Sequence, residues 1–267
     1  MREIGLRYVQ FQKIMNRFFV NQGDIHEDSI TIKDRDDIKH ISKVLRLSIS
    51  DQLEISDSQE FEYIAEIDFI SQDEINLLII DKNKFAREAK NRIDLFQGIP
   101  KLGKMEYIIQ KCVEIGANKI VPVFTERSVP LEKGNSANKV ERWQKVSNEA
   151  AKQCKRGILP QVSPSMNFTS MIKELKNYDF IILPYENEAS NTIKDVLVKI
   201  KRTEKFESIV NINRFAVIIG PEGGFPNTEV EALVSIGALK ASLGKTILRT
   251  ETAGAATLAM MMYELEL

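Results

Sequence analysis

The chain contains little cysteine and little histidine, and both shortages exclude kinds of chemistry. Two cysteines, Cys112 and Cys154, stand among 267 residues without CxxC spacing, so a disulfide framework is excluded and a reducing cytoplasm is favoured. The two histidines, His26 and His40, have no ligand partner at metal-binding spacing. Zinc sites and serine or cysteine triads both need such side chains. We therefore expect no metal, no histidine-based triad and a cytoplasmic location.

The sequence also lacks long apolar runs and two common nucleotide motifs. Its least polar stretch, residues 253–263, is too short to span a bilayer, and charges interrupt the first 14 residues, so we expect neither a membrane segment nor an export signal. The GxGxxG motif of dinucleotide enzymes is missing. Gly244-Lys245-Thr246 looks like the end of a phosphate-binding loop, but Leu239 stands where that loop needs a glycine. Nucleotide hydrolysis is therefore disfavoured.

The composition is that of an ordinary globular protein, but the charge is unevenly distributed. Apolar residues make up 43% and charged residues 28%, with a formal net charge of −1, which argues against a disordered chain. Residues 90–160 hold 14 Lys and Arg against 7 Asp and Glu, whereas residues 1–89 hold 12 against 18. The basic middle segment is typical of either a phosphate-binding surface or solvated helix faces.

Short β-rich segments dominate the first 85 residues. Stretches such as "EFEYIAEIDFI" and "EINLLIID" are rich in β-branched and aromatic residues and are separated by polar residues, which predicts a small barrel. One helix is expected to begin after Asp34, because aspartate is a good N-cap residue. Lys39, Lys43 and Arg46 would share one face of this helix, either as a solvated edge or as a nucleic-acid contact.

Strands and helices alternate from residue 90 onward. Buried strands are expected over 93–99, 119–125, 179–186, 214–220 and 239–244, and helices over 103–116 and 138–156. Such alternation predicts an α/β fold with a mostly parallel sheet covered by helices on both faces. Gly116 is well placed to end the first helix, and Thr228 with Glu231 predicts a capping box for a later helix. Cys112 lies on an apolar helix face and is interpreted as a packed, inert thiol.

Three loops follow predicted strands, at the edge of the sheet where open α/β folds bind ligands. They are "LPYENE" at 183–188, "IGPEGG" at 219–224 and "LGKTILRTETAG" at 243–254. Glycines would let the backbone of the second loop come close to a ligand. This composition suits an adenosine-like ligand, although a plain turn before a helix would use the same residues.

Taken together, these loops resemble the C-terminal signature of the SPOUT methyltransferases. "IGPEGGF" is followed about twenty residues later by "LGKTILRTETA". Four more stretches narrow the resemblance to the ribosomal RNA small subunit methyltransferase E family: "MNRFFV", "HISKVLRL", "GKMEYIIQKCVEIGANKIVPVFTERS" and "RWQKVSNEAAKQCKR". The resemblance runs from Met15 to the C-terminus. It implies S-adenosylmethionine-dependent methylation of N3 of one uridine in 16S rRNA.

The family resemblance also implies an architecture. Residues 15–85 would form a PUA-like β-barrel that binds RNA, and residues 90–267 a SPOUT domain with a mostly parallel sheet and a C-terminal trefoil knot. The family works as a homodimer on 16S rRNA, here expected within the small ribosomal subunit, without a membrane or a metal. Residues 1–14 precede the family pattern, so they are either an N-terminal extension or a sign that translation starts at Met15.

In the family these loops hold S-adenosylmethionine, chiefly through backbone contacts. By position, the resemblance assigns cofactor binding to Leu183, Tyr185, Glu186, Ile219, Gly220, Glu222, Gly223, Leu243, Gly244, Leu248, Thr252 and Ala253. Lys245 and Thr246 then fit no phosphate role. Arg249 matches the position of a cation that would stabilise the uridine anion; otherwise it would pair with Glu222 or Glu251. Glu251 would accept the N3 proton or only orient Arg249.

Seven basic residues are candidates for RNA contacts, some from the resemblance and some from the basic middle segment. They are Arg17, Arg46, Lys101, Lys104, Arg127, Lys152 and Arg156. Many relatives carry an acidic residue at the position of Lys152, so its role departs from the family pattern. Two alternatives stay open: an RNA-binding module of the same fold without catalysis, and a related enzyme that modifies another RNA site. The intact "GPEGG" and "LRTETA" loops disfavour the first.

Overall fold

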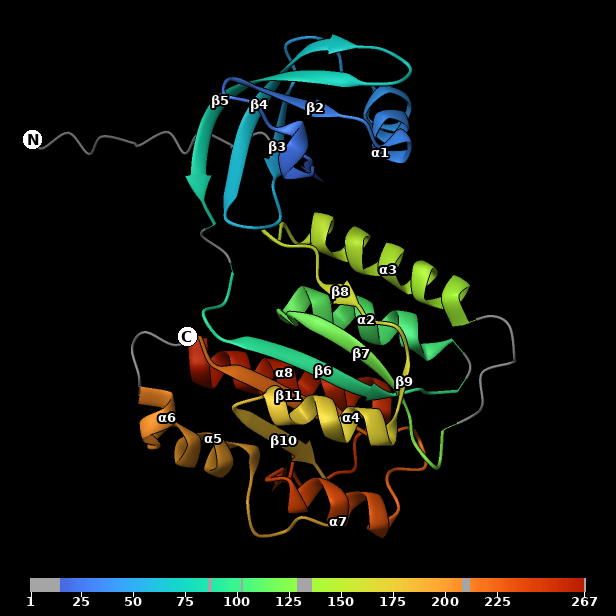
Figure 1. Ribbon diagram of the computed structural model, residues 1–267, viewed down its shortest axis with the longest axis vertical. Coiled ribbons are helices and arrows are strands. Elements are labelled where there is room, and N and C mark those ends of the chain that lie inside the picture. Colours follow the sequence, from blue (N-terminus) through green and yellow to red (C-terminus); the bar gives the residue numbers. More distant parts are fainter. Residues whose placement is uncertain (1–14, 86–87, 102, 129–135, 208–211, 267) are drawn as a thin grey trace, which may run out of the picture. The chain divides into compact units, whose positions relative to one another are not determined.

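The computed structural model describes residues 15–85, 88–101, 103–128, 136–207 and 212–266. The chain divides into two compact units, of which the first ends at Phe85 and the second comprises the rest (Figure 1). The N-terminal extension expected over residues 1–14 lies outside the described residues. No helix in the described part of the chain combines the length and low polarity needed to cross a membrane.

The first unit is built around one curved sheet of five strands. These are β1 (Arg17–Phe19), β2 (Ser29–Ile32), β3 (Gln52–Ser56), β4 (Phe61–Ile70) and β5 (Ile75–Lys84). Their order is β1-β3-β4-β5-β2, antiparallel except for the parallel pair β1–β3. Two register shifts between β4 and β5 bend the sheet. It thereby wraps around an apolar core that includes Phe18, Ile30 and Leu53.

The helix of this unit begins as predicted and ends earlier. The Asp34 side chain accepts a hydrogen bond from the Asp37 amide at 2.9 Å, at the start of α1 (Arg35–Lys39). A π-helical turn, η2 (His40–Val44), follows, and Arg46 has a positive φ of 53°. Because that conformation cannot continue a helix, Arg46 lies beyond the helix end. A short 3-10 turn, η1 (Gln22–Asp24), precedes β2.

The second unit is an α/β domain with one parallel sheet. Its strands are β6 (Arg92–Gly98), β7 (Lys119–Phe124), β8 (Gln161–Val162), β9 (Met166–Asn167), β10 (Phe180–Pro184), β11 (Arg214–Ile219) and β12 (Leu239–Ala241). The order is β12-β10-β11-β6-β7-β8, with β9 also paired to β7, and every described pair is parallel. The predicted parallel sheet is confirmed. The strand expected over 239–244 ends at Ala241.

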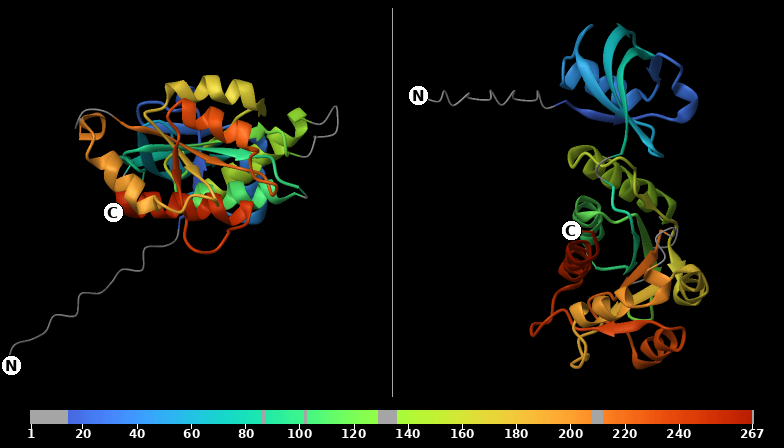
Figure 2. Two further views of the ribbon diagram at one scale, coloured as in Figure 1. Left: turned by 90° about the horizontal axis from the view of Figure 1, so that it is seen from below. Right: turned by 90° about the vertical axis from the view of Figure 1, so that its left-hand side faces the viewer.

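Helices cover both faces of this sheet, as predicted (Figure 2). They are α2 (Lys104–Ile115), α3 (Ser136–Gln153), α4 (Phe168–Glu174) with the 3-10 turn η3 (Leu175–Asn177), α5 (Ile193–Lys201), α6 (Glu204–Glu207), α7 (Asn227–Ser235) and α8 (Thr250–Glu266). Helices α2, α5 and α8 lie on one face, and α4 and α7 on the other. The trefoil knot stays a prediction.

Cys112 and Gly116 on α2 behave as the sequence predicts. Cys112 is fully buried, and burial raises the pKa of its thiol to about 12, so the thiol is packed and unreactive. Gly116 ends the helix with a positive φ of 123°, a conformation that L side chains rarely adopt. These two residues fix where α2 packs and where the chain turns toward β7.

The capping box predicted from Thr228 and Glu231 is wrong. Helix α7 already begins at Asn227, after Pro226, which makes no side-chain cap. The acidic residue that matters is Glu229, which is 8% exposed and whose Oε1 accepts a hydrogen bond from the Glu126 amide at 3.0 Å. Its Oε2 is buried without a hydrogen-bond partner among the described residues. Glu229 therefore ties the loop after β7 to the first turn of α7.

This buried carboxyl predicts a pH dependence of stability. Burial raises the pKa of Glu229 above its ordinary value of 4.5, so between these pKa values the folded state binds more protons than the unfolded chain. The contribution of Glu229 to the free energy of unfolding therefore falls as pH rises. Glu229→Gln keeps the oxygen that accepts from Glu126 and removes the charge. We expect the increase in the free energy of unfolding of Glu229→Gln relative to wild type, measured with urea, to be larger at about pH 8 than at about pH 5.

Glu231→Gln is the matched control, because Glu231 is exposed on the same helix. The difference in free energy of unfolding between Glu231→Gln and wild type should be the same at both pH values. A Glu229→Gln difference that does not change with pH would contradict the assigned shift.

Candidate active site

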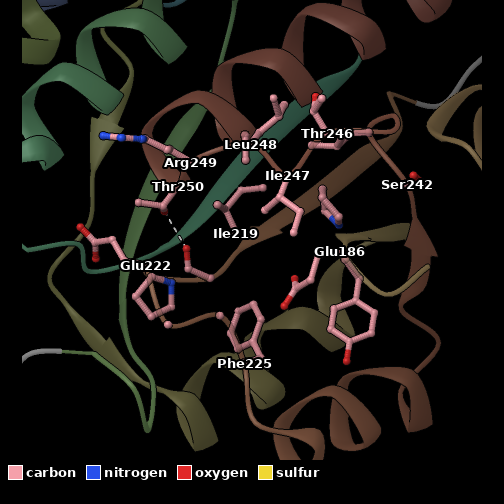
Figure 3. A pocket seen from close by; sticks show the side chains of 18 of the residues that line it. Glu186, Ile219, Glu222, Phe225, Ser242, Thr246, Ile247, Leu248, Arg249 and Thr250 are labelled. Carbon is pink, nitrogen blue, oxygen red and sulfur yellow. Dashed lines mark hydrogen bonds between the residues drawn. The ribbon is translucent and has the colours of Figure 1, made fainter. Parts of the chain in front are cut away.

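A pocket of about 560 Å³ lies where the three predicted loops meet, at the carboxyl ends of β10, β11 and β12. Its walls come from residues 184–186, 219–225 and 242–250, with Lys104 and Ala253 from the ends of α2 and α8 (Figure 3). This volume falls in the range of about 300–1,000 Å³ that small-molecule sites have. The sheet order thus converts three distant sequence segments into one site.

The second loop is a glycine-rich turn whose backbone forms the pocket floor. A Cβ at Gly220 would lie 3.2 Å from the Gly224 Cα and from the Phe225 ring, and Gly224 has a positive φ of 63°. A Cβ at Gly98, the last residue of β6, would lie 2.6 Å from the Pro221 Cδ. Glycine is therefore required for close packing as well as for backbone conformation.

The third loop leaves β12 and reaches α8 without regular structure. Gly244 has a positive φ of 129°, and Ser242 Oγ lies 3.2 Å from its carbonyl oxygen. Ile247 is 82% exposed, which is unusual for a large aliphatic side chain. If this loop folds over a ligand, the same contact would cover the Ile247 side chain.

The first loop is held rigid by a buried carboxylate. Glu188 accepts hydrogen bonds from the amides of Ser190 and Asn191, and these bonds lower its pKa. Tyr185 donates its amide to the carbonyl of Ala241 at 3.0 Å. Tyr185 and Glu186 are thereby placed in the pocket wall, with Glu186 beside Gly224.

One end of the pocket carries a cluster of charges. Lys104 Nζ lies 3.1 Å from Glu222 Oε1 and 3.2 Å from Glu251 Oε2, and these hydrogen bonds raise the pKa of Lys104. A hydrogen bond from its own amide, together with Lys104, lowers the pKa of Glu251. Partial burial acts to raise the pKa of Glu222, but bonds from its own amide, the Lys101 amide and Lys104 outweigh it and lower the pKa.

Arg249 lies at the same end and is available to a substrate. Figure 3 shows Arg249 and Glu222 at one end of the pocket and Ser242 and Glu186 at the other. The Arg249 side chain is exposed, and its guanidinium makes no hydrogen bond or ion pair with the residues that the structure describes. The predicted alternative, in which Arg249 pairs with Glu222 or Glu251, is therefore not what this arrangement shows, because Lys104 occupies both carboxylates.

Most of the predicted cofactor residues line this pocket. Those that do are Tyr185, Glu186, Ile219, Gly220, Glu222, Gly223, Leu243, Gly244, Leu248 and Ala253. Leu183 is instead fully buried in the core cluster and Thr252 is exposed outside the lining. Further lining residues fall inside or beside the three predicted loops but were not predicted individually from the sequence: Pro184, Pro221, Gly224, Phe225, Ser242, Lys245, Thr246, Ile247 and Thr250.

Three of the predicted RNA residues gather beside the charged end. The Lys101 amide and the Lys104 ammonium both donate to Glu222, and the Arg127 guanidinium donates to the Gly223 carbonyl at 2.8 Å. Lys101 and Arg127 are exposed. Lys152 lies elsewhere, near the end of α3, at 3.8 Å from Glu149. In the first unit, Arg46 is exposed after the helix.

Arg17 and Arg156 do not fit the predicted contact with RNA. The Arg17 side chain is 2% exposed and pairs with Glu54 and Glu62 on the neighbouring strands. The Arg156 side chain is 8% exposed, pairs with Glu88 and donates to one carbonyl of α2 and to one in the turn after it. Burial takes both guanidinium groups out of reach of a phosphate, so we assign them structural roles.

The described residues contain no group of three or more His, Cys, Asp or Glu side chains arranged to hold a metal ion. The polar groups of the pocket are instead backbone groups, a few hydroxyls and the charged cluster. This set suits an organic ligand with apolar and charged parts.

Comparison with known proteins agrees with these features. The RNA methyltransferase domain family matches residues 87–262, and the RNA methyltransferase PUA domain family matches residues 32–85. The ribosomal RNA small subunit methyltransferase E of Bacillus subtilis is 30% identical over 260 residues, which cover 95% of this chain and 98% of that protein. Its counterpart from Buchnera aphidicola (strain APS) is 34% identical over 215 residues, 80% of either chain.

Solved structures show the same fold. One from Legionella pneumophila, described as a methyltransferase in complex with the bound cofactor SAM, has a TM-score of 0.77 at 27% identity and covers 93% of this chain and 97% of that one. The ribosomal RNA small subunit methyltransferase E of Neisseria gonorrhoeae, bound to S-adenosyl methionine, has the same TM-score and coverage at 24% identity. With two domain matches in the predicted order and a pocket formed by the signature loops, the chain belongs to the ribosomal RNA small subunit methyltransferase E family.

Proposed function

We propose that this protein transfers a methyl group from S-adenosylmethionine to N3 of a specific uridine in 16S rRNA, in the cytoplasm. One observation carries the proposal: the glycine-rich pocket ends at an exposed Arg249, which forms no ion pair with the described residues, beside the Lys104–Glu222–Glu251 cluster. A cofactor held in the pocket and a base brought to Arg249 would meet at this end. Membership of the methyltransferase E family supports the choice of RNA as substrate.

The pocket residues fit S-adenosylmethionine. Gly220 and Gly224 leave a cradle that a Cβ would fill, so backbone groups can approach an adenosine closely. Ile219, Leu243 and Leu248 supply apolar surface for the adenine. Glu186 lies in the wall at the opposite end from Arg249 and can accept hydrogen bonds from ribose hydroxyls or an ammonium group.

The cofactor supplies a methyl group on a sulfonium, which needs no metal for activation. What the chain must provide is stabilisation of the uridine after N3 has lost its proton, when negative charge spreads over O2 and O4. A fixed cation is the natural stabiliser. Arg249 can provide it, because its guanidinium has no other partner in the described residues and presents several donors.

Glu251 is better suited to orient charges than to accept the N3 proton. Its lowered pKa keeps the carboxylate ionised and makes it a weaker base. Its contact with Lys104 also holds the first turn of α8 against α2. We therefore assign Glu251 and Glu222 to the placement of Lys104 and leave proton removal to solvent.

RNA would approach from the side where Lys101 and Arg127 are exposed. Both are attached to the glycine-rich loop, Lys101 through Glu222 and Arg127 through Gly223. Phosphate contacts at these positions would fix the register of the RNA, while the pocket selects the base. Arg46 is a further exposed candidate in the first unit.

Nucleoside mass spectrometry tests the proposed reaction. Small ribosomal subunits from cells that lack this modification are incubated with the protein and S-adenosylmethionine, and naked 16S rRNA is treated in parallel. New N3-methyluridine at one site is the expected result. A different methylated nucleoside would assign another target, and an absence of cofactor binding would favour an RNA-binding module without catalysis.

Removal of the cation should slow the chemical step. Arg249→Ala is expected to lower the methylation rate by a factor of about 10²–10³, which corresponds to about 2.7–4 kcal/mol of lost transition-state stabilisation. The measurement is single-turnover transfer of labelled methyl to small subunits, with circular dichroism to show that the fold is retained. Arg202→Ala, at an exposed position at the end of α5, is the control and should retain wild-type rates. Full activity of Arg249→Ala would exclude the role of Arg249.

We further propose a homodimer that uses the outer face of α8. Tyr263 is 71% exposed on this helix, and Met260 is also exposed. Large apolar side chains on one helix are typical of an interface when they are otherwise solvated. Met260 and Tyr263 lie on the later turns of α8, away from the helix start that borders the pocket.

Sedimentation of the purified protein tests the dimer. The wild type should sediment at twice the mass of the 30.4 kDa chain, and Tyr263→Glu should sediment as a monomer, because a buried unpaired charge opposes association. Val234→Glu, at an exposed apolar position on α7, is the matched control and should remain dimeric. A monomeric wild type would refute the proposal.

A further inference from the structure

A buried hydrogen-bonded chain connects the sheet to two of the pocket loops. Gln97 on β6 is fully buried, and its Nε2 donates to Thr250 Oγ1 at 2.9 Å and to the Gly98 carbonyl at 2.9 Å. Thr250 Oγ1 in turn donates to the Gly220 carbonyl at 2.7 Å, the bond drawn as a dashed line in Figure 3. One amide and one hydroxyl thus join β6, the glycine-rich loop and the start of α8.

The glutamine is not explained by stability alone. Its Oε1 is buried and has no hydrogen-bond partner among the described residues, and an unsatisfied buried acceptor costs free energy. An apolar side chain of similar shape would avoid that cost. Buried polar groups that are unsatisfied in a native protein call for an explanation, and here the donor half of the amide touches the residue between Arg249 and Glu251.

We propose that Gln97 and Thr250 act as a positioning pair for the cofactor loops. Gln97 does not line the pocket, so it acts through Thr250. The Thr250 hydroxyl accepts from Gln97 and donates to Gly220, so its own position is fixed from two sides. Through this link, the glycine-rich loop and the loop that ends at Arg249 are held at the separation that the ligand requires. The identity of that ligand rests on the proposed function.

A second contact, between Gly98 and Pro221, further restricts movement of the glycine-rich loop relative to β6. Gly98, the neighbour of Gln97, lies so close to the glycine-rich loop that an added Cβ would be 2.6 Å from the Pro221 Cδ and 2.7 Å from the Pro221 nitrogen. Backbone packs directly on backbone at this point. A shift of the loop relative to β6 is therefore resisted by the close contact with Gly98 and by the bonds from Gln97 through Thr250 to Gly220.

Gln97→Leu separates a positioning role from a purely structural one. A positioning role predicts weaker binding at a nearly unchanged melting temperature, whereas a structural role predicts a lower melting temperature with unchanged binding. At similar size, leucine removes the unsatisfied Oε1 but also the donor to the Gly98 carbonyl, so its two effects on stability oppose each other. We expect the melting temperature to stay nearly the same, while the Kd for S-adenosylhomocysteine rises about tenfold, which is about 1.4 kcal/mol. Isothermal titration calorimetry with this unreactive analogue measures binding without RNA, and thermal unfolding of the same samples measures stability. Gln153→Leu, an exposed glutamine at the end of α3, is the matched control.

Changes at Thr250 test whether the two residues act as a pair. Thr250→Val keeps the shape and loses the hydroxyl, whereas Thr250→Ser keeps the hydroxyl and should bind the analogue more tightly than Thr250→Val. The double variant Gln97→Leu with Thr250→Val should bind about as weakly as Thr250→Val alone, because the second change removes a bond that is already broken. Additive losses would overturn the pairing.

The outcomes separate this inference from the proposed function. A Gln97→Leu protein that melts lower and binds the analogue as the wild type does would overturn the positioning role and leave the proposed function standing. A wild type that does not bind the analogue would overturn both. A tenfold loss of binding at unchanged melting temperature supports the positioning role whichever RNA site is methylated.

Discussion

The contact between the end of β6 and the glycine-rich loop is the constraint on which the active site depends. Gly98 admits the Pro221 backbone only because it has no side chain, and the Gln97 amide reaches past it to Thr250. A parallel sheet places the ends of β10, β11 and β12 at one edge, but it does not by itself set the distances between their loops. Close packing and one buried hydrogen-bonded chain set them, because neither tolerates a displacement of the loop.

The two cations at the charged end of the pocket differ in their partners, because Lys104 pairs with both nearby carboxylates and Arg249 with neither. Lys104 forms ion pairs with Glu222 and Glu251, and their lowered pKa values keep them ionised. The charge of Arg249 also contributes to the lowered pKa of Glu251, but the guanidinium forms no hydrogen bond or ion pair in the described part of the site. A guanidinium that is not already bound to a carboxylate can pair with a developing anion directly, since no existing bond must break first.

The sequence predicted the three loops and the parallel sheet because both depend on local signals, namely glycine spacing and alternating apolar segments. It could not predict which cations are available. Arg17 pairs with Glu54 and Glu62, which stand 37 and 45 residues away in the chain, and no local pattern announces such a contact. The capping box of Thr228 and Glu231 failed for another reason: helix α7 already begins at Asn227, after Pro226, so Thr228 lies within the first turn and does not cap the helix.

The same reasoning limits what net charge can say about RNA binding. Residues 90–160 hold 14 basic residues against 7 acidic ones, yet Arg156 is buried against Glu88 and Lys104 lies between two carboxylates. These two members of the excess are therefore engaged within the protein. Lys101 and Arg127 of the same segment are exposed beside the charged end of the pocket, where Arg249 also lies. Cations at this end can hold a single nucleotide and its neighbouring phosphates in place, which is what methylation at one position requires.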